Sequence, residues 1–208
     1  MISDTTERMR LAVLVSGSGS NLQALIDASA GGDFGAEIAV VIADRPGVQA
    51  LDRATAAGIA NVVVSWSDFP DRSAFTSVVC DVAHEHSVAG LVLAGFMRIL
   101  APVAMERYPH AIINVHPALL PAFPGPNAVG QAIQHGVRVT GVTVHFVDEE
   151  VDHGPIILQE SVAVRPGDTV ATLHKRIQAV EHQVLPLVVD AFGKGQLRVD
   201  GRNVIWDT

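Results

Sequence analysis

The chain has 208 residues, of which 49% are hydrophobic, and it carries 14 Lys and Arg against 22 Asp and Glu, a formal net charge of −8. A chain of this length and apolar content can bury the core of one large or two small domains, which excludes a largely disordered protein. The negative charge repels a phosphate backbone, so polymeric DNA or RNA is excluded as an expected partner.

Cysteine use and hydropathy predict a cytoplasmic protein outside the membrane. The single Cys80 cannot form an internal disulfide, and residues 1–7 are acidic and polar where a signal peptide would be basic and then apolar. The longest apolar stretch, Val88 to Met97, is far shorter than the about 20 residues that a membrane span needs. Because Cys80 lies in a helical pattern without a CxxC partner, we interpret it as a buried structural thiol.

Strand and helix patterns alternate through the first half of the chain. Four short, nearly all-apolar runs are typical of parallel strands buried on both faces, and they cover residues 11–15, 38–42, 62–64 and 90–94. Helices are predicted between them, over residues 21–30, 48–57 and 73–86. This alternation predicts an α/β fold with an open, mostly parallel twisted sheet and helices on both faces, as in Rossmann-like proteins.

The pattern changes after a strand that starts at Ala111 and ends at His116. Pro117 ends this strand because it has no amide hydrogen to give to a ladder. Residues 141–147 and 155–161 then flank an acidic turn, which predicts an antiparallel hairpin in the C-terminal half.

A long helix is expected to close the chain. Asp168 or Thr169 would cap it, and apolar residues recur at helical spacing from Val170 to Leu187. No repeat, low-complexity tract or linker divides the sequence, so we predict a single domain over residues 1–208.

A loop of glycine and serine, Ser16 to Asn21, joins the first predicted strand to the first helix. Its glycines let backbone amides approach an anion, and the helix N-terminus adds partial positive charge, which favours a phosphate site. The third glycine of a dinucleotide fingerprint would fall at Leu22, and no Gly-Lys-Ser/Thr follows, so the Rossmann and Walker motifs are both incomplete. A monophosphate site and a tight structural turn both remain open.

Asn114 and His116 are two residues apart in an extended segment, so their side chains leave the strand on the same side. They lie at its carboxyl end, where open α/β sheets bind ligands. Acyl transfer to an amine needs a donor to the carbonyl oxygen and a group that relays the proton of the amine, and Asn and His can supply them. A carboxylate from the acidic turn would orient the His116 ring and raise its pKa. Taken alone, the pair is more typical of a strand-end histidine satisfied by its neighbours than of catalysis, and only the motifs that accompany it reverse this preference.

Metal binding is the main alternative for a chain with nine histidines. His84 and His86 diverge on a predicted helix, no His-Glu-x-x-His occurs, and the acidic turn lacks the spacing and glycine of a calcium loop. We therefore expect no metal.

With these motifs in order, the chain resembles the phosphoribosylglycinamide formyltransferases, folate-dependent enzymes of purine biosynthesis. The resemblance covers Arg10 to Leu197 and rests on four segments, Ser16 to Asn21, Leu93 to Leu100, Asn114 to Pro121 and Asp152 to Pro155. Methionyl-tRNA formyltransferase and formyltetrahydrofolate deformylase share the Asn/His/Asp set. Each of those enzymes carries an additional domain, for which this chain is not expected to have room.

The resemblance implies transfer of a formyl group from the co-substrate 10-formyltetrahydrofolate to the amine of glycinamide ribonucleotide. Asn114 and protonated His116 would hold the oxygen of the tetrahedral intermediate, while Asp152 would support that charge and position water. Asp152 is preferred to Asp148 because only Asp152 matches the Asp-x-Gly-Pro motif of the family. The implied partners are small molecules, and the implied state is a monomer or homodimer.

The resemblance also divides the chain into a nucleotide-binding half, about 10–110, and a folate-binding and catalytic half, about 111–208. The ribonucleotide contacts that it implies are Gly19, Ser20, Asn21, Gln178 and Glu181. The folate contacts that it implies are Arg72, Met97, Arg98, Ile99, Leu100, Asn114, Asp148, Glu149, Glu150, Val151 and Asp152, with the pterin held largely by backbone groups of residues 97–100.

One departure from the family lies just after Gly125, where a histidine is common and this chain has Pro126 and Asn127. Three other functions stay open. A folate hydrolase would use the same three residues with water as acceptor, a dinucleotide-dependent oxidoreductase would use the glycine and serine loop, and a nucleotide-binding relative would lack catalysis.

Overall fold

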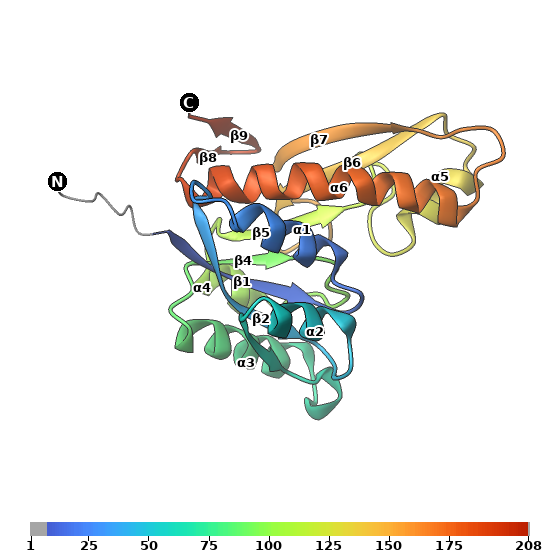
Figure 1. Cartoon of the computed structure of the whole chain (residues 1–208). Helices are drawn as coiled ribbons and strands as arrows, with labels where there is room; N and C mark the ends of the chain where they lie inside the picture. The colour runs from blue at the N-terminus through green and yellow to red at the C-terminus, as the bar shows by residue number, and fades with distance from the viewer. Residues whose placement is uncertain (1–7, 208) are drawn as a thin grey trace.

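The computed structural model describes residues 8–207, so the acidic segment 1–7 lies outside the described residues. One sheet of nine strands runs through the molecule in the order β3-β2-β1-β4-β5-β6-β7-β9-β8 (Figure 1). The strands are β1 (Met9–Val15), β2 (Ala36–Ala43), β3 (Ala60–Val63), β4 (Gly90–Leu93), β5 (Ile112–His116), β6 (Val139–Phe146), β7 (Ile156–Ala163), β8 (Leu197–Asp200) and β9 (Asn203–Trp206). The helices are α1 (Ser20–Ser29), α2 (Gln49–Ala56), α3 (Arg72–Glu85), α4 (Pro102–Arg107), α5 (Ala128–Gln134) and α6 (Val170–Gly193), with a 3-10 turn η1 (Trp66–Asp68).

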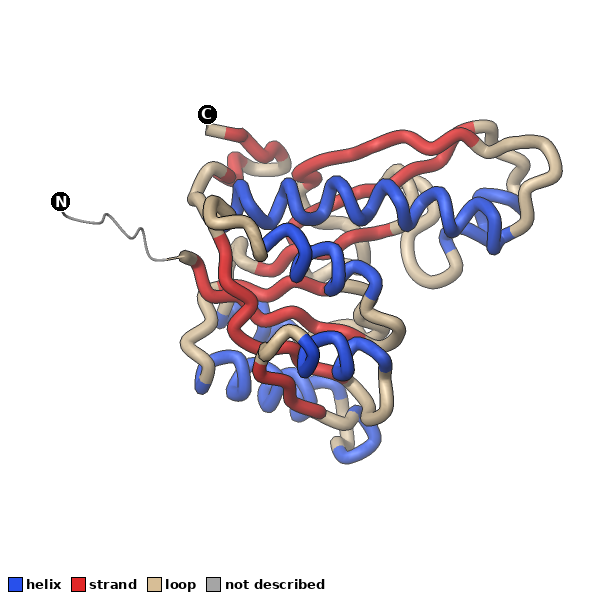
Figure 2. The backbone as a smooth tube through the Cα atoms, in the orientation of Figure 1, coloured by secondary structure: helices blue, strands red, loops and turns tan. Residues whose placement is uncertain are grey.

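Strands β1 to β5 form the parallel part of the sheet, and helices cover both of its faces (Figure 2). Along β1, Leu11 and Val13 enter one apolar cluster with residues of α1, α2 and α6, whereas Ala12 and Leu14 enter another with residues of α3 and α4. Alternate side chains of a strand point to opposite faces, so a strand covered on both sides must be apolar throughout. The predicted open, mostly parallel sheet is confirmed.

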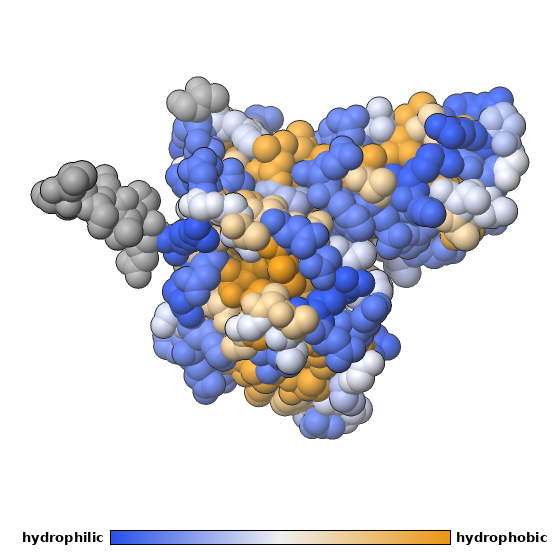
Figure 3. All heavy atoms as spheres, in the orientation of Figure 1, coloured by the Kyte–Doolittle hydropathy of each residue, from blue (hydrophilic) through white to orange (hydrophobic). Residues whose placement is uncertain are grey.

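The antiparallel part of the sheet starts where β6 pairs with β5 and continues into the β6–β7 hairpin. The predicted hairpin is therefore confirmed, and each of its strands is eight residues long. With α5 and the start of α6 these strands form an arm that extends to the right in Figure 1. The space-filling view is hollowed where this arm meets the parallel part, toward which the carboxyl ends of β1 and β4 point (Figure 3).

Thr169 rather than Asp168 caps α6. The Thr169 hydroxyl accepts a hydrogen bond from the Thr172 amide at 3.2 Å, and Thr172 reciprocates, which forms a capping box. Asp168 instead pairs with Arg176, about two turns into the helix. The helix continues through Pro186 and past the predicted apolar stripe to Gly193.

The prediction that a helix closes the chain was wrong. After α6 the chain forms the β8–β9 hairpin, in which β9 pairs with β7 at Ile156 and Asn203. Each strand has only four residues, too few to show a clear alternation, and packing on β7 supports them, since the Trp206 indole N–H donates to the Ile157 carbonyl at 3.3 Å. The short elements η1, α4 and α5 were missed for the same reason.

Cys80 is buried in α3, as expected for a structural thiol. Burial raises the pKa of its thiol to about 11, which leaves it protonated at neutral pH.

Candidate active site

The glycine and serine loop lies between the carboxyl end of β1 and the start of α1. Gly19 caps α1 with a φ of +69°, in the left-handed region that favours glycine. A Cβ at this position would lie 2.7 Å from the Cβ of Ala50, so the loop also packs against α2 too closely for a side chain. Both constraints require glycine here and direct the first amides of α1 outward.

A cavity of about 290 Å³ lies against this loop. Its lining combines the loop with residues of the β4 end, of β5 and of α6, namely Ser16, Gly17, Ser18, Gly19, Ser20, Asn21, Ala94, Gly95, Met97, Val115, Pro117, His174, Gln178 and Glu181. Val115 and Pro117 flank His116, so the cavity brings the predicted phosphate loop next to the predicted catalytic strand.

All five residues predicted to bind a ribonucleotide line this cavity. Asn21 and Glu181 join across the α1–α6 contact, where the Asn21 amide donates to the Glu181 carboxyl at 3.0 Å. Glu181 is 6% exposed, and burial raises its pKa against the opposing effects of Asn21 and His174. The Asn21 carbonyl oxygen is buried without a partner in the described structure. The site therefore presents a buried carboxyl group and an unpaired acceptor beside the loop.

The sequence reasoning missed His174, which also lines the cavity. His174, Gln178 and Glu181 are four and then three residues apart, so they share one face of α6. This spacing was visible in the sequence once Gln178 and Glu181 had been selected.

Asn114, His116 and Asp152 lie together at the end of β5. The Asn114 amide donates to one oxygen of the Asp152 carboxylate at 3.3 Å, and the His116 Nδ1 lies 3.3 Å from the other. The two strand residues therefore share a face, as their spacing predicted, and the turn after β6 supplies the carboxylate. What these side chains do chemically remains a prediction.

Asp152 is held in a constrained turn. Its φ of +53° is uncommon for a residue with a side chain, and the Gly125 amide donates to its carboxylate at 2.7 Å. Gly154 follows with no room for a Cβ, which would lie 1.9 Å from the Phe146 carbonyl oxygen. Burial alone would raise the pKa of Asp152, but the nearby His145, the hydrogen bond from the Gly125 amide and the nearby His116 lower it, so the carboxyl is ionised.

The predicted rise in the pKa of His116 was wrong. The ring is 5% exposed, and burial lowers its pKa by more than the attraction of Asp152 and the hydrogen bond to Phe123 raise it. Its Nε2 donates to the Phe123 carbonyl at 2.8 Å. The sequence showed the carboxylate but not the depth at which the loop and β6 bury the ring, so His116 is predominantly neutral at pH 7.

His145 is a second residue that the sequence reasoning missed. It pairs with Asn114 across β5 and β6, and its Nε2 lies 3.1 Å from the Asn114 amide nitrogen. Its Nδ1 faces the Phe146 carbonyl at 2.8 Å, so Nε2 is the ring nitrogen that can accept from the Asn114 amide. His145 thus fixes the orientation of the Asn114 amide, and only the strand register could have shown this.

Two segments predicted to bind folate expose apolar side chains. Met97 is 67% exposed, Ile99 52% and Val151 48%, whereas most large apolar side chains are buried. Val147, just before the acidic turn, packs into the same apolar cluster as Leu100. The corner after β4 and the acidic turn therefore each expose apolar side chains suited to a flat heterocycle.

Three residues predicted to bind folate have side chains that do not face the exposed apolar surface of the corner and the acidic turn. Leu100 is 5% exposed and belongs to the core, and the Arg98 guanidinium turns inward to Asp44 at 2.7 Å. The Leu100 side chain is therefore closed to a ligand, and the charge of the partly exposed Arg98 side chain is paired with Asp44. Arg72 is exposed at the first position of α3 and pairs with none of the acidic-turn carboxylates within residues 8–207.

The acidic turn itself is tied to the C-terminal hairpin. Asp148 pairs with His153 at 2.8 Å, and Arg202, from the turn between β8 and β9, donates to the His153 carbonyl at 2.7 Å. The hairpin that the sequence reasoning missed therefore supports the turn that carries Asp152.

Asn127, where the chain departs from its resemblance, caps α5 with a φ of +63°. Asn tolerates this left-handed conformation better than most residues do. Its side chain packs over Gly130, where a Cβ would lie 2.4 Å from the Asn127 amide oxygen. Asn127 is thus accommodated by the backbone of the loop.

In the described part of the chain, no group of three or more His, Cys, Asp or Glu side chains is arranged to hold a metal ion. Within residues 8–207, no helix combines the length and the apolar character that a membrane crossing requires.

Comparisons with known proteins agree with this fold. A family model described as formyl transferase matches residues 9–189. The chain is 43% identical over 201 residues to the trifunctional purine biosynthetic protein adenosine-3 of Homo sapiens, a match that covers 96% of the chain and 20% of that protein. It is 38% identical over 180 residues to the phosphoribosylglycinamide formyltransferase of Bacillus subtilis (strain 168), covering 86% of the chain and 92% of the relative.

Among solved structures, glycinamide ribonucleotide transformylase 1 from Symbiobacterium toebii superimposes with a TM-score of 0.94 at 43% identity, covering 97% of this chain and 95% of that one. The chain belongs to the formyl transferase family. Within that family it groups with the phosphoribosylglycinamide formyltransferases, so the resemblance predicted from its motifs is confirmed. The chain spans about a fifth of the length of the trifunctional relatives that it matches.

Proposed function

We propose that this protein transfers the formyl group of 10-formyltetrahydrofolate to the amine of glycinamide ribonucleotide in purine biosynthesis. The observation that carries the proposal is the position of the Asn114, His116 and Asp152 cluster beside the loop cavity. Val115 and Pro117 line that cavity together with Gly19 and Glu181. A ribonucleotide held there would place its amine near His116.

The reaction forms a bond from the amine nitrogen to the formyl carbon and breaks the bond from that carbon to N10 of the folate. The carbonyl oxygen gains negative charge in between, and the amine proton must reach N10. Asn114 donates to the oxygen the amide hydrogen that Asp152 accepts at rest, since hydrogen-bond donors placed where charge develops stabilise the transition state. A neutral His116 accepts the amine proton and returns it to N10.

Asp152 stabilises the charged ring of His116 while it carries the proton. Its lowered pKa keeps it ionised, and it lies 3.3 Å from the His116 Nδ1. At rest the His116 Nε2–H donates to the Phe123 carbonyl, at the position that the amine would take. When the amine replaces that carbonyl, the proton of the neutral ring lies on Nδ1, toward Asp152, and Nε2 accepts the amine proton. The starting state differs from the protonated His116 expected from sequence because burial disfavours the charged ring.

The two substrates would bind on two different surfaces, the ribonucleotide in the loop cavity and the folate on the corner after β4 and the acidic turn. The amides of Gly19, Ser20 and Asn21 would hold the phosphate, and Gln178 with Glu181 would contact the sugar and glycinamide parts. On the other side, the backbone of residues 97–100 and the turn at 148–152 would hold the folate, with Met97, Ile99 and Val151 against its ring system.

This assignment divides the chain into a nucleotide half, about 10–110, and a folate and catalytic half, about 111–208, of one domain. Its partners would be these two small molecules, and a cytoplasmic setting and a monomeric or dimeric state remain predictions.

The test mixes purified protein with 10-formyltetrahydrofolate, with and without glycinamide ribonucleotide, and follows deformylation of the folate by absorbance. We expect turnover only when the ribonucleotide is present, together with formyl glycinamide ribonucleotide as product. Equal turnover in both mixtures would instead identify a folate hydrolase. No turnover in either mixture, with the ribonucleotide bound in a titration, would identify the non-catalytic relative.

A further inference from the structure

The corner after β4, residues 95–99, is fastened to the ends of two other strands. The Met97 amide donates to the Ser16 hydroxyl at 2.8 Å, where Ser16 is the first residue after β1. The Arg98 guanidinium donates to the carboxylate of Asp44, the first residue after β2, at 2.7 Å. Two consecutive residues of the corner are therefore held, one through its backbone and the other through its side chain.

These two attachments join at Asp44. The Ser16 hydroxyl, which accepts from Met97, lies close enough to the Asp44 carboxylate to lower its pKa. The side chain of Asp44 is fully buried, and Arg45 is its third partner, at 3.1 Å. Burial by itself would raise the pKa of Asp44, but the hydrogen bonds from Arg45, Arg98 and Ser16 lower it, so the carboxylate is ionised.

The Arg98 side chain is fixed on its other side by Trp66, whose ring centre lies 5.1 Å from the guanidinium carbon. A buried carboxylate between an aromatic-stacked arginine and a serine hydroxyl leaves the corner few alternative positions. The exposed Met97 and Ile99 side chains stand on that corner. Ser16 meanwhile begins the phosphate loop and lines the cavity, so one network contacts both candidate ligand surfaces.

We propose that Asp44 is a positioning residue that holds the 95–99 corner, through Ser16 and Arg98, in the conformation that binds the pterin of the folate. This inference rests on the proposed function and deepens it. Asp44 touches neither the cavity nor the corner backbone, so its effect passes through these two neighbours.

The experiment compares Asp44→Asn with the wild-type full chain. Asn keeps the shape of the side chain but removes the charge that pairs with Arg98. We expect the KM and the calorimetric Kd for 10-formyltetrahydrofolate to rise about tenfold. The loss of one hydrogen bond between charged groups weakens the binding conformation of the corner by about that factor. The KM for the ribonucleotide should change less than twofold, a split that a general loss of stability would not produce.

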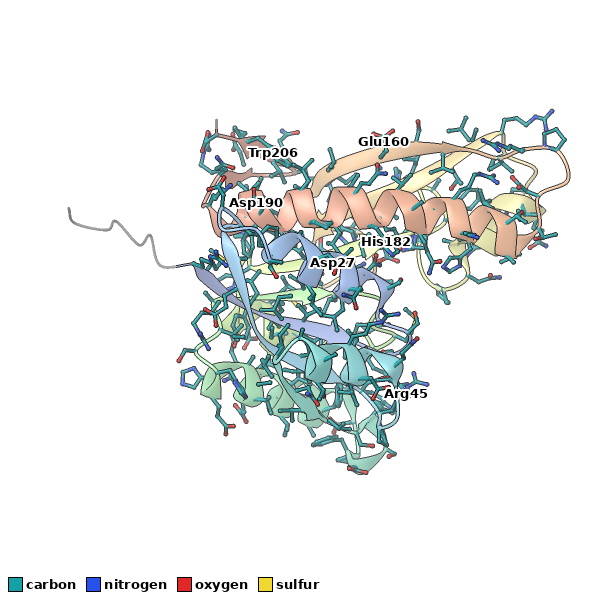
Figure 4. All side chains as sticks on the ribbon, viewed as in Figure 1. Asp27, Arg45, Glu160, His182, Asp190 and Trp206 are labelled. Carbon is teal, nitrogen blue, oxygen red and sulfur yellow. The ribbon has the colours of Figure 1, made fainter. Side chains whose placement is uncertain are left out.

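Arg45→Gln is the matched control, because Arg45 is half-exposed and pairs with the same carboxylate without touching the corner. Figure 4 labels Arg45 at the edge of the parallel part, where β2 ends. We expect its folate affinity to match the wild type. Arg98→Gln should reproduce the folate defect, and the Asp44→Asn/Arg98→Gln double variant should be no worse than either single one. Arg98→Gln also supplies the test if Asp44→Asn does not fold, because the Arg98 side chain is partly exposed.

The outcomes separate the two proposals. If the wild type neither binds the folate nor transfers its formyl group, the proposed function fails. If the wild type is active but Asp44→Asn or Arg98→Gln retains its folate affinity within twofold, the positioning role fails. An equal rise in both KM values, or additive defects in the double variant, would also overturn it.

Discussion

The two parts of the sheet present ligand surfaces of different kinds. At the ends of the parallel strands β1 and β4, the surface is mostly backbone, namely the Ser16 to Asn21 loop and the corner at 95–99. At the end of the antiparallel pair β5 and β6, the surface consists of side chains, with Asn114, His116 and His145 around Asp152. The first surface depends on where the chain turns, and the second on which residues face one another.

This difference separates binding from chemistry. Backbone amides at a helix start bind an anion without needing to change charge. Proton relay and oxyanion stabilisation need titratable or amide side chains in a set order, and buried strands hold these more precisely than loops do. Variants in the antiparallel part should therefore lower turnover, while variants in the parallel part should lower affinity.

The largest expected effect is in the antiparallel part. We expect His116→Ala to lower kcat by at least ~100-fold, the usual scale for a proton-transfer group, with both KM values within threefold of the wild type. Steady-state kinetics with each substrate varied in turn measures this. His84→Ala, on the exposed side of α3, is the matched control and should keep full activity. Full activity of the His116 variant would remove it from the mechanism.

A smaller effect, on substrate affinity rather than on turnover, is expected in the parallel part. Gly19→Ala forces a left-handed φ on alanine and drives a Cβ against Ala50, a strain on the order of 1–3 kcal/mol. We expect the KM for the ribonucleotide to rise about tenfold, in proportion to that strain, while kcat and the folate KM change little. Gly32→Ala, where a Cβ would meet nothing within 4 Å, is the control. A loss of kcat with an unchanged ribonucleotide KM would contradict the division between the two surfaces.

The smallest effect concerns stability and pH. Because burial lowers the pKa of His116 from 6.5, the stability it contributes is present above that value and is lost as the pH falls through the lower folded-state pKa. Asp152 also has a lowered pKa, but its contribution is lost only below its ordinary value of 3.8. Between pH 7 and 5 the wild type should therefore lose more stability than His116→Gln.

We expect this difference to appear as a Tm shift of roughly 2–4 °C, the change that about 1 kcal/mol makes in a chain of this size. Thermal unfolding followed by circular dichroism at several pH values measures it. His182, whose pKa burial also lowers, is present in both proteins and cancels in the comparison. Parallel Tm profiles for the two proteins would mean that burial does not lower the pKa of His116 in the folded state.

Local patterns predicted much of the parallel part and of the site. The all-apolar runs gave β1, β2 and β4 to within two residues at each end, because strands buried on both faces admit little else. The shared face of Asn114 and His116 follows from the two-residue period of a strand. The features that escaped prediction depend on contacts between segments distant in sequence.

His145 illustrates this dependence, since its contact with Asn114 requires the register of β5 against β6. The pKa of His116 changes in the direction opposite to that expected because its burial comes from a loop and a neighbouring strand. The Arg98 side chain was expected beside the folate, yet a carboxylate 54 positions earlier in the sequence attracts it inward. The β8–β9 hairpin needs β7 as a partner before its four-residue strands are stable.

The placement of β1 and β9 affects how the protein can be linked to others. In Figure 1, the start of β1 and the β8–β9 hairpin lie on the left, whereas β1 and β4 point their carboxyl ends to the right, where the loop cavity lies. A domain fused before Met9 or after Trp206 would therefore project away from the entrance used by substrates. Such a fold can be built into a multienzyme polypeptide at either end and leave its own chemistry unobstructed.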